Sequence, residues 1–190
     1  HAYYSAGGFV TMANPKVESF YWIQMYKMAS AVMDGQRELY DLMGPWGVKP
    51  TSWPDVHWDL NLQLTYWAFF TSNRVGMVNS LTSKLIANTQ TLINNVPIAW
   101  RNDSAAGPSD SSSPLMIQSC GAIGGLPFNN TCLTAPGGKG NATATGNLIW
   151  VLQQWHNVYR YNGFDDAELE KLFPLLARAV TYYTHITHMN

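Results

Sequence analysis

The segment HWDLNLQLTYW, residues 57–67, brings together side chains that could do chemistry. Asp59 and Asn61 are two positions apart, so in an extended segment their side chains project to the same side of the backbone. A carboxylate beside a carboxamide could orient and deprotonate a water molecule. Asn61 is also a good N-cap, because its side chain can accept from free amides of a first helical turn. The alternative is structural: Asn61 caps a helix and Asp59 complements its dipole.

Large aromatic and polar side chains accompany this pair. Trp and Tyr offer flat apolar faces with a polar edge, which suits sugar rings, and the chain contains 8 Trp and 10 Tyr. A large aromatic core is the alternative explanation, and a buried structural histidine is the alternative for His156. The candidate substrate-binding residues are Trp53, His57, Trp58, Gln63, Trp67 and His156.

The composition narrows the class of partner. Charged residues make up 12% of the chain and the formal net charge is −1, so nothing indicates a nucleic acid or an anionic membrane as partner. No apolar run approaches the ~20 residues that a membrane span needs. His185 and His188 are spaced so that they could share a metal on one helix. The sequence offers no third ligand nearby, and we predict no metal and no cofactor.

One stretch, residues 101–146, is rich in Gly, Pro, Ser and Asn and predicts a long surface loop. It contains three N-glycosylation sequons, at Asn102, Asn129 and Asn141, and the chain's only two cysteines, Cys120 and Cys132. An even cysteine count in a sequon-bearing loop predicts a disulfide in an oxidising compartment. Two free thiols in a cytosolic protein are the alternative. We therefore expect a protein that is secreted or lies on the extracellular surface.

The rest of the chain has helical periodicity and no sustained strand alternation. Asn14-Pro15 supplies a helix start signal, and the segment NGFDD predicts a turn between the last two helices. We predict an all-α single domain, residues 1–190, with 101–146 as an inserted loop. The predicted helices span residues 17–33, 61–72, 77–94, 147–161 and 167–188.

Several segments resemble one enzyme family. WPDVHWDLNLQLTYW is similar to the N-I-N-L-Q-M-N-Y-W segment of glycoside hydrolase family 95, the inverting α-L-fucosidases and related α-L-galactosidases. Upstream, ESFYWIQMYKMAS and LYDLMGPWG resemble helices that precede this motif. Downstream, WHNVYRYNGFDDAELEKLFPLLARAVTYYTHI resembles the family's helix–turn–helix. The resemblance covers most of the chain outside 101–146, and the NLQ-x-x-YW core is its most specific part.

The resemblance implies a fold and a mechanism. The family fold is an (α/α)6 barrel, which needs well over 190 residues at about 11–12 residues per helix plus connections; about five helices would form an amino-proximal part of it. In the family, two asparagines hold the attacking water, an aspartate polarises it and a glutamate protonates the leaving oxygen. The second asparagine corresponds to Asn61, whereas the first corresponds to Asp59, a departure from the pattern. Neither the acid nor its partner aspartate has a match here, and we expect both to lie beyond residue 190.

Two functions follow as hypotheses. The first is an extracellular glycoside hydrolase of this type, in which Asp59 and Asn61 handle the water and the chain carries only that side of the site. Its partners would be a carbohydrate and the remaining part of its own polypeptide. The second is a secreted glycoprotein that keeps the barrel scaffold for carbohydrate binding or structure without catalysis. An acid glutamate facing Asn61 would distinguish the first from the second, because inverting hydrolysis needs an acid and a base about 6.5–9.5 Å apart.

Overall fold

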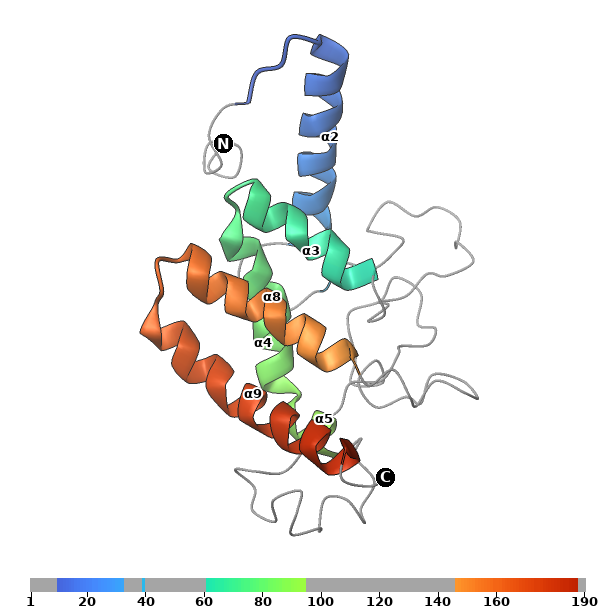
Figure 1. Cartoon of the computed structure of the whole chain (residues 1–190). Helices are drawn as coiled ribbons and strands as arrows, with labels where there is room; N and C mark the ends of the chain where they lie inside the picture. The colour runs from blue at the N-terminus through green and yellow to red at the C-terminus, as the bar shows by residue number, and fades with distance from the viewer. Residues whose placement is uncertain (1–9, 33–38, 40–60, 95–145, 188–190) are drawn as a thin grey trace, which may run out of the picture.

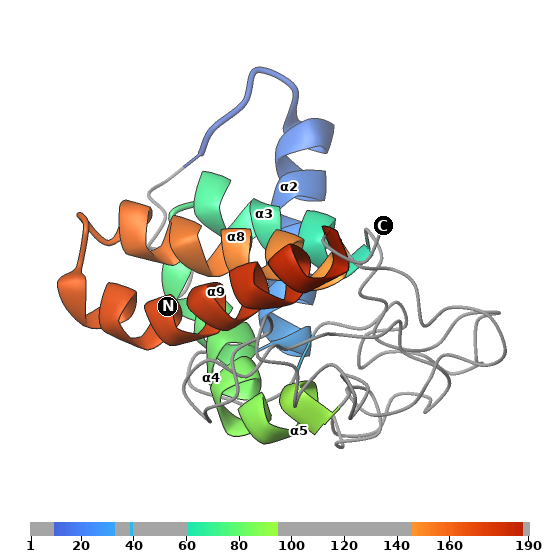
Figure 2. The same ribbon diagram turned by 60° about the horizontal axis from the view of Figure 1, so that its bottom comes forward.

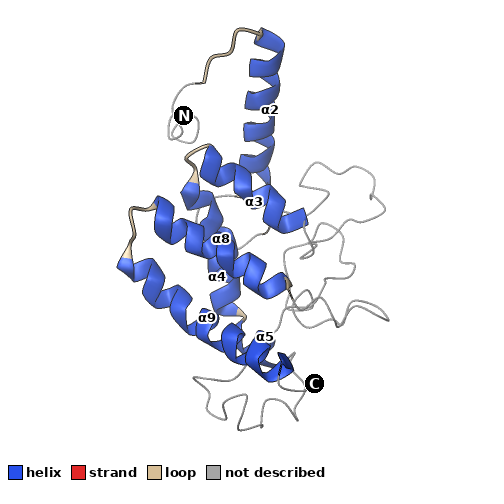
Figure 3. Cartoon of the chain, in the orientation of Figure 1, coloured by secondary structure: helices blue, strands red, loops and turns tan. Residues whose placement is uncertain are grey.

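The structure, a computed structural model of the chain, describes residues 10–32, 39, 61–94 and 146–187. All regular secondary structure in these ranges is helical, which confirms the all-α prediction (Figure 3). The (α/α)6 barrel and the disulfide-closed loop stay predictions, since residues 95–145 lie outside the described ranges. None of the described helices is both long and apolar enough to cross a membrane.

The helices follow the predicted order. The elements are α2 (Pro15–Ala31), α3 (Asn61–Thr71), the 3-10 helix η1 (Val75–Val78), α4 (Asn79–Ala87), α5 (Thr89–Asn94), α8 (Asn147–Tyr161) and α9 (Asp166–Thr187). The helix start predicted at Asn14-Pro15 is confirmed. The Asn14 side chain accepts from the Lys16 amide at 3.0 Å, and Pro15 occupies the first turn, where a missing N–H costs nothing.

The predicted helix 77–94 is wrong in one respect, because it is interrupted at Asn88. Both the backbone N–H and the side-chain Nδ2 of Asn88 donate to the Lys84 carbonyl, at 3.1 and 2.9 Å. Its backbone leaves the helical region, with φ −115° and ψ 16°, and its own carbonyl accepts from Leu92 at 3.0 Å. One asparagine therefore ends α4 and begins α5, by satisfying backbone groups that a continuous helix would pair differently.

Helix α8 lies between two neighbours (Figure 1). It packs against α3 on one side and α9 on the other. In Figures 1 and 2, α3 and α8 run in the same direction, whereas α9 returns antiparallel after the short turn that follows Tyr161. The largest fully buried side chains are Trp155, Tyr66, Phe69, Phe70, Leu62, Leu81, Leu85 and Leu92.

Helices α3 and α8 end in the same way. After α8, the N–H of Phe164 donates to the Tyr159 carbonyl at 2.9 Å and the N–H of Gly163 to the Arg160 carbonyl at 3.3 Å. These two bonds form a Schellman motif, and the Phe164 and Tyr159 rings, 5.4 Å apart, add the apolar contact that accompanies it. Gly163 has a φ of 77°, which its missing Cβ permits. The turn predicted from NGFDD is confirmed.

The corresponding motif after α3 uses a different residue. Asn73 takes the left-handed position, with a φ of 55°, and its N–H donates to the Phe70 carbonyl at 3.1 Å. The N–H of Arg74 donates to the Phe69 carbonyl at 2.7 Å. The Arg74 side chain is buried and its Nη1 donates to the Ser72 carbonyl, also at 2.7 Å. Arg74 thus stabilises the corner that leads from α3 into η1.

Candidate functional site

The structure describes four of the predicted site residues. Asn61, Gln63 and Trp67 lie on α3, and His156 lies on α8. The predicted residues outside the described ranges are Asp59, Trp53, His57, Trp58, Asn102, Asn129, Asn141, Cys120 and Cys132. The geometry of the Asp59–Asn61 pair therefore stays a prediction.

Helix α3 places its three candidates at different depths. Asn61 is half-buried and is the first residue of α3, and the residue before it lies outside the described ranges, so the predicted N-cap role stays a prediction. Its carbonyl accepts from the Thr65 hydroxyl at 2.9 Å. Gln63 is fully buried, whereas Trp67 is 36% exposed and contacts the buried Phe70 edge to face at 6.1 Å. Gln63 thus faces the protein interior and Trp67 borders the solvent.

Helix α8 carries three buried carboxamides that the sequence did not lead us to select. Asn147, Gln154 and Asn157 are each at most 5% exposed. Their spacings of seven and three residues place them on one side of an α-helix with 3.6 residues per turn. We call these three residues the amide face of α8. The neighbouring Gln153 is exposed, so the adjacent glutamines of this helix have opposite environments.

The amide face contains hydrogen-bonding atoms without protein partners. Within the described part of the chain, neither the Oε1 nor the Nε2 of Gln154 has a hydrogen-bond partner. The same holds for the Nδ2 atoms of Asn147 and Asn157. An unmade hydrogen bond at a buried polar group costs about 1–3 kcal/mol, and buried polar groups in native proteins are nearly always bonded. This concentration on one helix face makes the amide face the candidate functional site among the described residues.

The register between α3 and α8 shows what the amide face lies against. The rings of Phe70 on α3 and Tyr161 on α8 are 5.3 Å apart. Seven residues earlier on each helix stand Gln63 and Gln154, on the same faces as those rings. Because the two helices run in the same direction (Figure 1), the two glutamines lie at the same level of the α3–α8 interface. A stripe of carboxamides thus leads into an aromatic end formed by Trp67, Phe70 and Tyr161.

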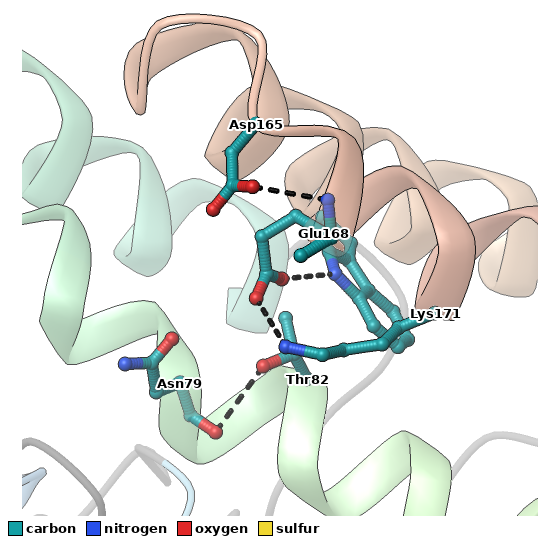
Figure 4. Close-up of polar contacts among 7 residues, drawn as sticks. Asn79, Thr82, Asp165, Glu168 and Lys171 are labelled. Atoms are coloured by element: carbon teal, nitrogen blue, oxygen red, sulfur yellow. Dashed lines mark hydrogen bonds and ion pairs between the residues drawn. The ribbon is translucent and has the colours of Figure 1, made fainter.

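On the side of α8 toward α9, in contrast to the amide face, a buried polar group has a hydrogen-bond partner. Trp155 is fully buried, and its Nε1 donates to Glu168 Oε2 at 3.0 Å (Figure 4). The other carboxylate oxygen of Glu168 accepts from Lys171 Nζ at 2.7 Å. Figure 4 also labels Asn79 and Thr82 of α4, where the Thr82 hydroxyl donates to the Asn79 carbonyl at 3.3 Å. The hydrogen bond to Glu168, and then its negative charge, raise the pKa of Lys171.

The first turn of α8 also has a protein partner. The Tyr183 hydroxyl, from α9, is hydrogen-bonded to the backbone of Ile149. Burial raises the pKa of Tyr183, the neighbouring Tyr182 raises it further, and the bond to Ile149 partly offsets both effects. The beginning of α8 is therefore tied to α9.

His156 lies away from the amide face. It follows Gln154 by two residues, which turns it to about the opposite side of the helix. There it is half-buried and its ring is 5.8 Å from that of Tyr159. The structure therefore does not bring His156 together with Gln63. No group of three or more His, Cys, Asp or Glu side chains that could hold a metal ion occurs among the described residues.

No protein-family model matches the chain, and no curated protein matches it. The resemblance to glycoside hydrolase family 95 therefore rests on the quoted segments.

A sequence signal for the missed residues exists. In NLIWVLQQWHN, residues 147–157, the carboxamides of Asn147, Gln154 and Asn157 share one side of the helix. A stripe of carboxamides at helical spacing is a pattern that would have singled out these residues. The sequence alone could not distinguish buried Gln154 from exposed Gln153, because both sides of α8 carry buried residues.

Proposed function

We propose that the protein is an extracellular, glycoside hydrolase-like protein that binds a carbohydrate against the amide face of α8. The observation that supports this most directly is Gln154, whose two amide atoms have no hydrogen-bond partner within the described part of the chain. Because Gln154 is 0% exposed, a sugar would reach these atoms only by displacing the residues that cover them. A carboxamide offers one acceptor oxygen and two N–H donors. A sugar hydroxyl both donates and accepts, so a row of carboxamides matches a ring bearing several hydroxyls.

The aromatic end of the same interface fits this ligand class. Trp67 and Tyr161 are partly exposed and both contact Phe70. Aromatic faces pack against the apolar C–H faces of sugar rings, while carboxamides bind the hydroxyl edges. A site that combines the two kinds of side chain is typical of carbohydrate recognition, and neither net charge nor a basic patch favours an anionic ligand.

For the substrate we propose an α-L-fucoside or a related glycoside, on the resemblance to family 95. Hydrolysis would invert the anomeric carbon. Asp59 and Asn61 would hold and polarise the attacking water, and Asn61 lies one turn or less before Gln63 at the beginning of α3. This chain would carry only the water-positioning side, so the acid that protonates the leaving oxygen would come from further polypeptide.

A second function, carbohydrate binding without catalysis, is favoured by one observation. The sequences of α3 and α8 contain no Asp and no Glu, so neither helix supplies a general acid to the amide face. Glu168 is held by Trp155 and Lys171 on the α9 side of α8. General acid–base catalysis contributes about 10²–10⁴-fold in rate. A protein with the amide face but no facing acid would bind sugar and release no product.

One experiment separates the two functions. The natural full-length polypeptide is titrated calorimetrically with α-L-fucosyl, α-L-galactosyl and α-D-mannosyl disaccharides, and the same mixtures are assayed for released monosaccharide. Binding of the fucoside or galactoside together with release supports the hydrolase. Binding without release supports the binding protein. Absence of binding to any of the three sugars contradicts both.

The long loop has its own tests. We expect a glycan on at least one of Asn102, Asn129 and Asn141, and a bond between Cys120 and Cys132, which closes a loop for which chain entropy gives about 3 kcal/mol. Peptide mass mapping of protein from the natural source measures both. Unmodified asparagines at all three sequons would contradict the extracellular location.

A further inference from the structure

The turn between α8 and α9 contains the sequence Asn162-Gly163, the only Asn-Gly pair in the chain. We propose that Asn162 is a site of deamidation, and that the Schellman motif at the end of α8 controls its rate. The argument for this modification does not rest on the proposed carbohydrate site. It rests on the exposure of the pair, on the missing Cβ of Gly163 and on the hydrogen bonds of the turn.

The reaction needs only water. The backbone nitrogen of Gly163 attacks Cγ of the Asn162 side chain, forms a C–N bond and loses its proton to solvent, and the side-chain amide leaves as ammonia. The five-membered succinimide that results is hydrolysed at either carbonyl. Hydrolysis gives an aspartate with the normal peptide linkage or an isoaspartate linked through its side chain. The net change is the exchange of an amide for an acid.

The surroundings of the pair favour the attack. Asn162, Gly163 and Phe164 are all exposed, so water and base have access. Apart from the two residues next to it in the chain, no residue has an atom within 4 Å of the place where a Cβ on Gly163 would be. The attacking nitrogen therefore approaches the side chain without steric hindrance from its own residue or from the rest of the fold.

The folded turn opposes the attack. The Gly163 N–H is engaged with the Arg160 carbonyl at 3.3 Å, a long hydrogen bond, and Asn162 has a ψ of 19°. Closing the ring requires rotation about the Cα–C bond of Asn162. This rotation breaks the hydrogen bond between the Gly163 N–H and the Arg160 carbonyl. The shorter bond from Phe164 to Tyr159, 2.9 Å, and the contact between their rings hold the turn closed. The reaction therefore proceeds through local opening of the turn.

The corner after α3 supplies an internal control. Asn73 is also exposed and also takes part in a Schellman motif. The next residue, Arg74, carries a buried side chain, and its N–H donates to the Phe69 carbonyl at 2.7 Å. Its nitrogen is both hindered and firmly bonded, so Asn73 should keep its amide under conditions in which Asn162 loses it.

Conversion would change the end of α8. An aspartate at position 162 places a negative charge at the negative end of the α8 dipole, close in sequence to Asp165 and Asp166. An isoaspartate also adds a backbone atom to the turn and disrupts the paired hydrogen bonds of the Schellman motif. Either product should loosen the turn that joins α8 to α9.

The test is peptide mapping of the natural polypeptide during incubation at mildly alkaline pH, with isoaspartate quantified at Asn162 and Asn73. Phe164→Ala removes the ring contact and should speed conversion at Asn162 about threefold to tenfold. Asn162→Gln, which must form a larger ring, should suppress it. Asn162 that stays an amide while a synthetic peptide of residues 158–168 converts would overturn the proposal. Equal rates in the native protein, in Phe164→Ala and in denaturant would overturn the control by the turn.

Discussion

Two adjacent residues of α8, Gln154 and Trp155, are both fully buried and both carry a polar group. They differ in whether that polar group has a hydrogen-bond partner. The indole N–H of Trp155 has a carboxylate partner in Glu168. The carboxamide of Gln154 has no partner in the part of the chain that the structure describes. The side toward α9 thus obeys the rule that buried polar groups are bonded, and the side toward α3 departs from it. Departures of this kind are expected at functional or strained sites.

The largest expected effect on stability is on the side of α8 toward α9, where the buried Trp155 N–H has a hydrogen-bond partner. Trp155→Ala removes the bulkiest fully buried side chain of the core and should lower the free energy of unfolding by about 3–5 kcal/mol. Urea denaturation of the full-length protein measures this. A loss below about 1 kcal/mol would mean that Trp155 is not part of a packed core.

The next effect concerns the carboxylate alone. Glu168→Ala leaves the buried Trp155 N–H without its acceptor, so the free energy of unfolding should fall by about 1–3 kcal/mol. Glu168→Gln keeps an oxygen that can accept and should lose less. If the two variants are equally stable, the hydrogen bond to Trp155 contributes nothing beyond the charge.

For a substitution on the amide face, we expect the free energy of unfolding to rise rather than to fall. Gln154→Leu replaces a buried carboxamide that has no hydrogen-bond partner in the described chain by an apolar side chain of similar size. The free energy of unfolding should therefore rise by about 1 kcal/mol or stay unchanged. Gln153→Leu, at the exposed neighbour, is the matched control and should change stability by less than about 0.5 kcal/mol. A clear loss of stability in Gln154→Leu would show that Gln154 is a structural residue.

The smallest effect depends on pH. Lys171 has a raised pKa because of Glu168, so its ion pair stabilises the fold below the ordinary lysine pKa, and this contribution is lost as the pH rises through the raised pKa. The Lys171 side chain is 52% exposed, which limits the contribution to about 0–1 kcal/mol. Unfolding of the protein and of Lys171→Met should differ near neutral pH and converge in strong alkali. A difference that persists there would point to packing.

Local sequence rules predicted the helices well because their signals lie within a few residues. Asn14-Pro15 marked the start of α2, and the glycine of NGFDD marked the end of α8. The break at Asn88 was missed, since an asparagine within an apolar periodic segment fits a helix until its side chain bonds the Lys84 carbonyl.

The candidate site was less predictable. Gln63 was selected from its motif and is buried, and its role in a site stays a prediction, whereas Gln154 was overlooked. Its significance depends on which side of α8 meets α3, and that is decided by contacts between residues some ninety positions apart, such as Phe70 and Tyr161. Propensity and periodicity carry no information about such pairing. The predicted water site at Asp59 and Asn61 can be tested by whether Asp59→Ala abolishes product release while leaving sugar binding intact.

The most direct test of the amide face is ligand-dependent stability. A ligand at about 100 times its Kd raises the free energy of unfolding by about 2.7 kcal/mol. Thermal unfolding with and without a saturating α-L-fucoside should show this shift in the full-length protein and in Gln153→Leu. In Gln154→Leu the shift at the same concentration should largely disappear, although that variant is at least as stable without sugar. An undiminished shift in Gln154→Leu would contradict the assignment of the amide face as the carbohydrate site.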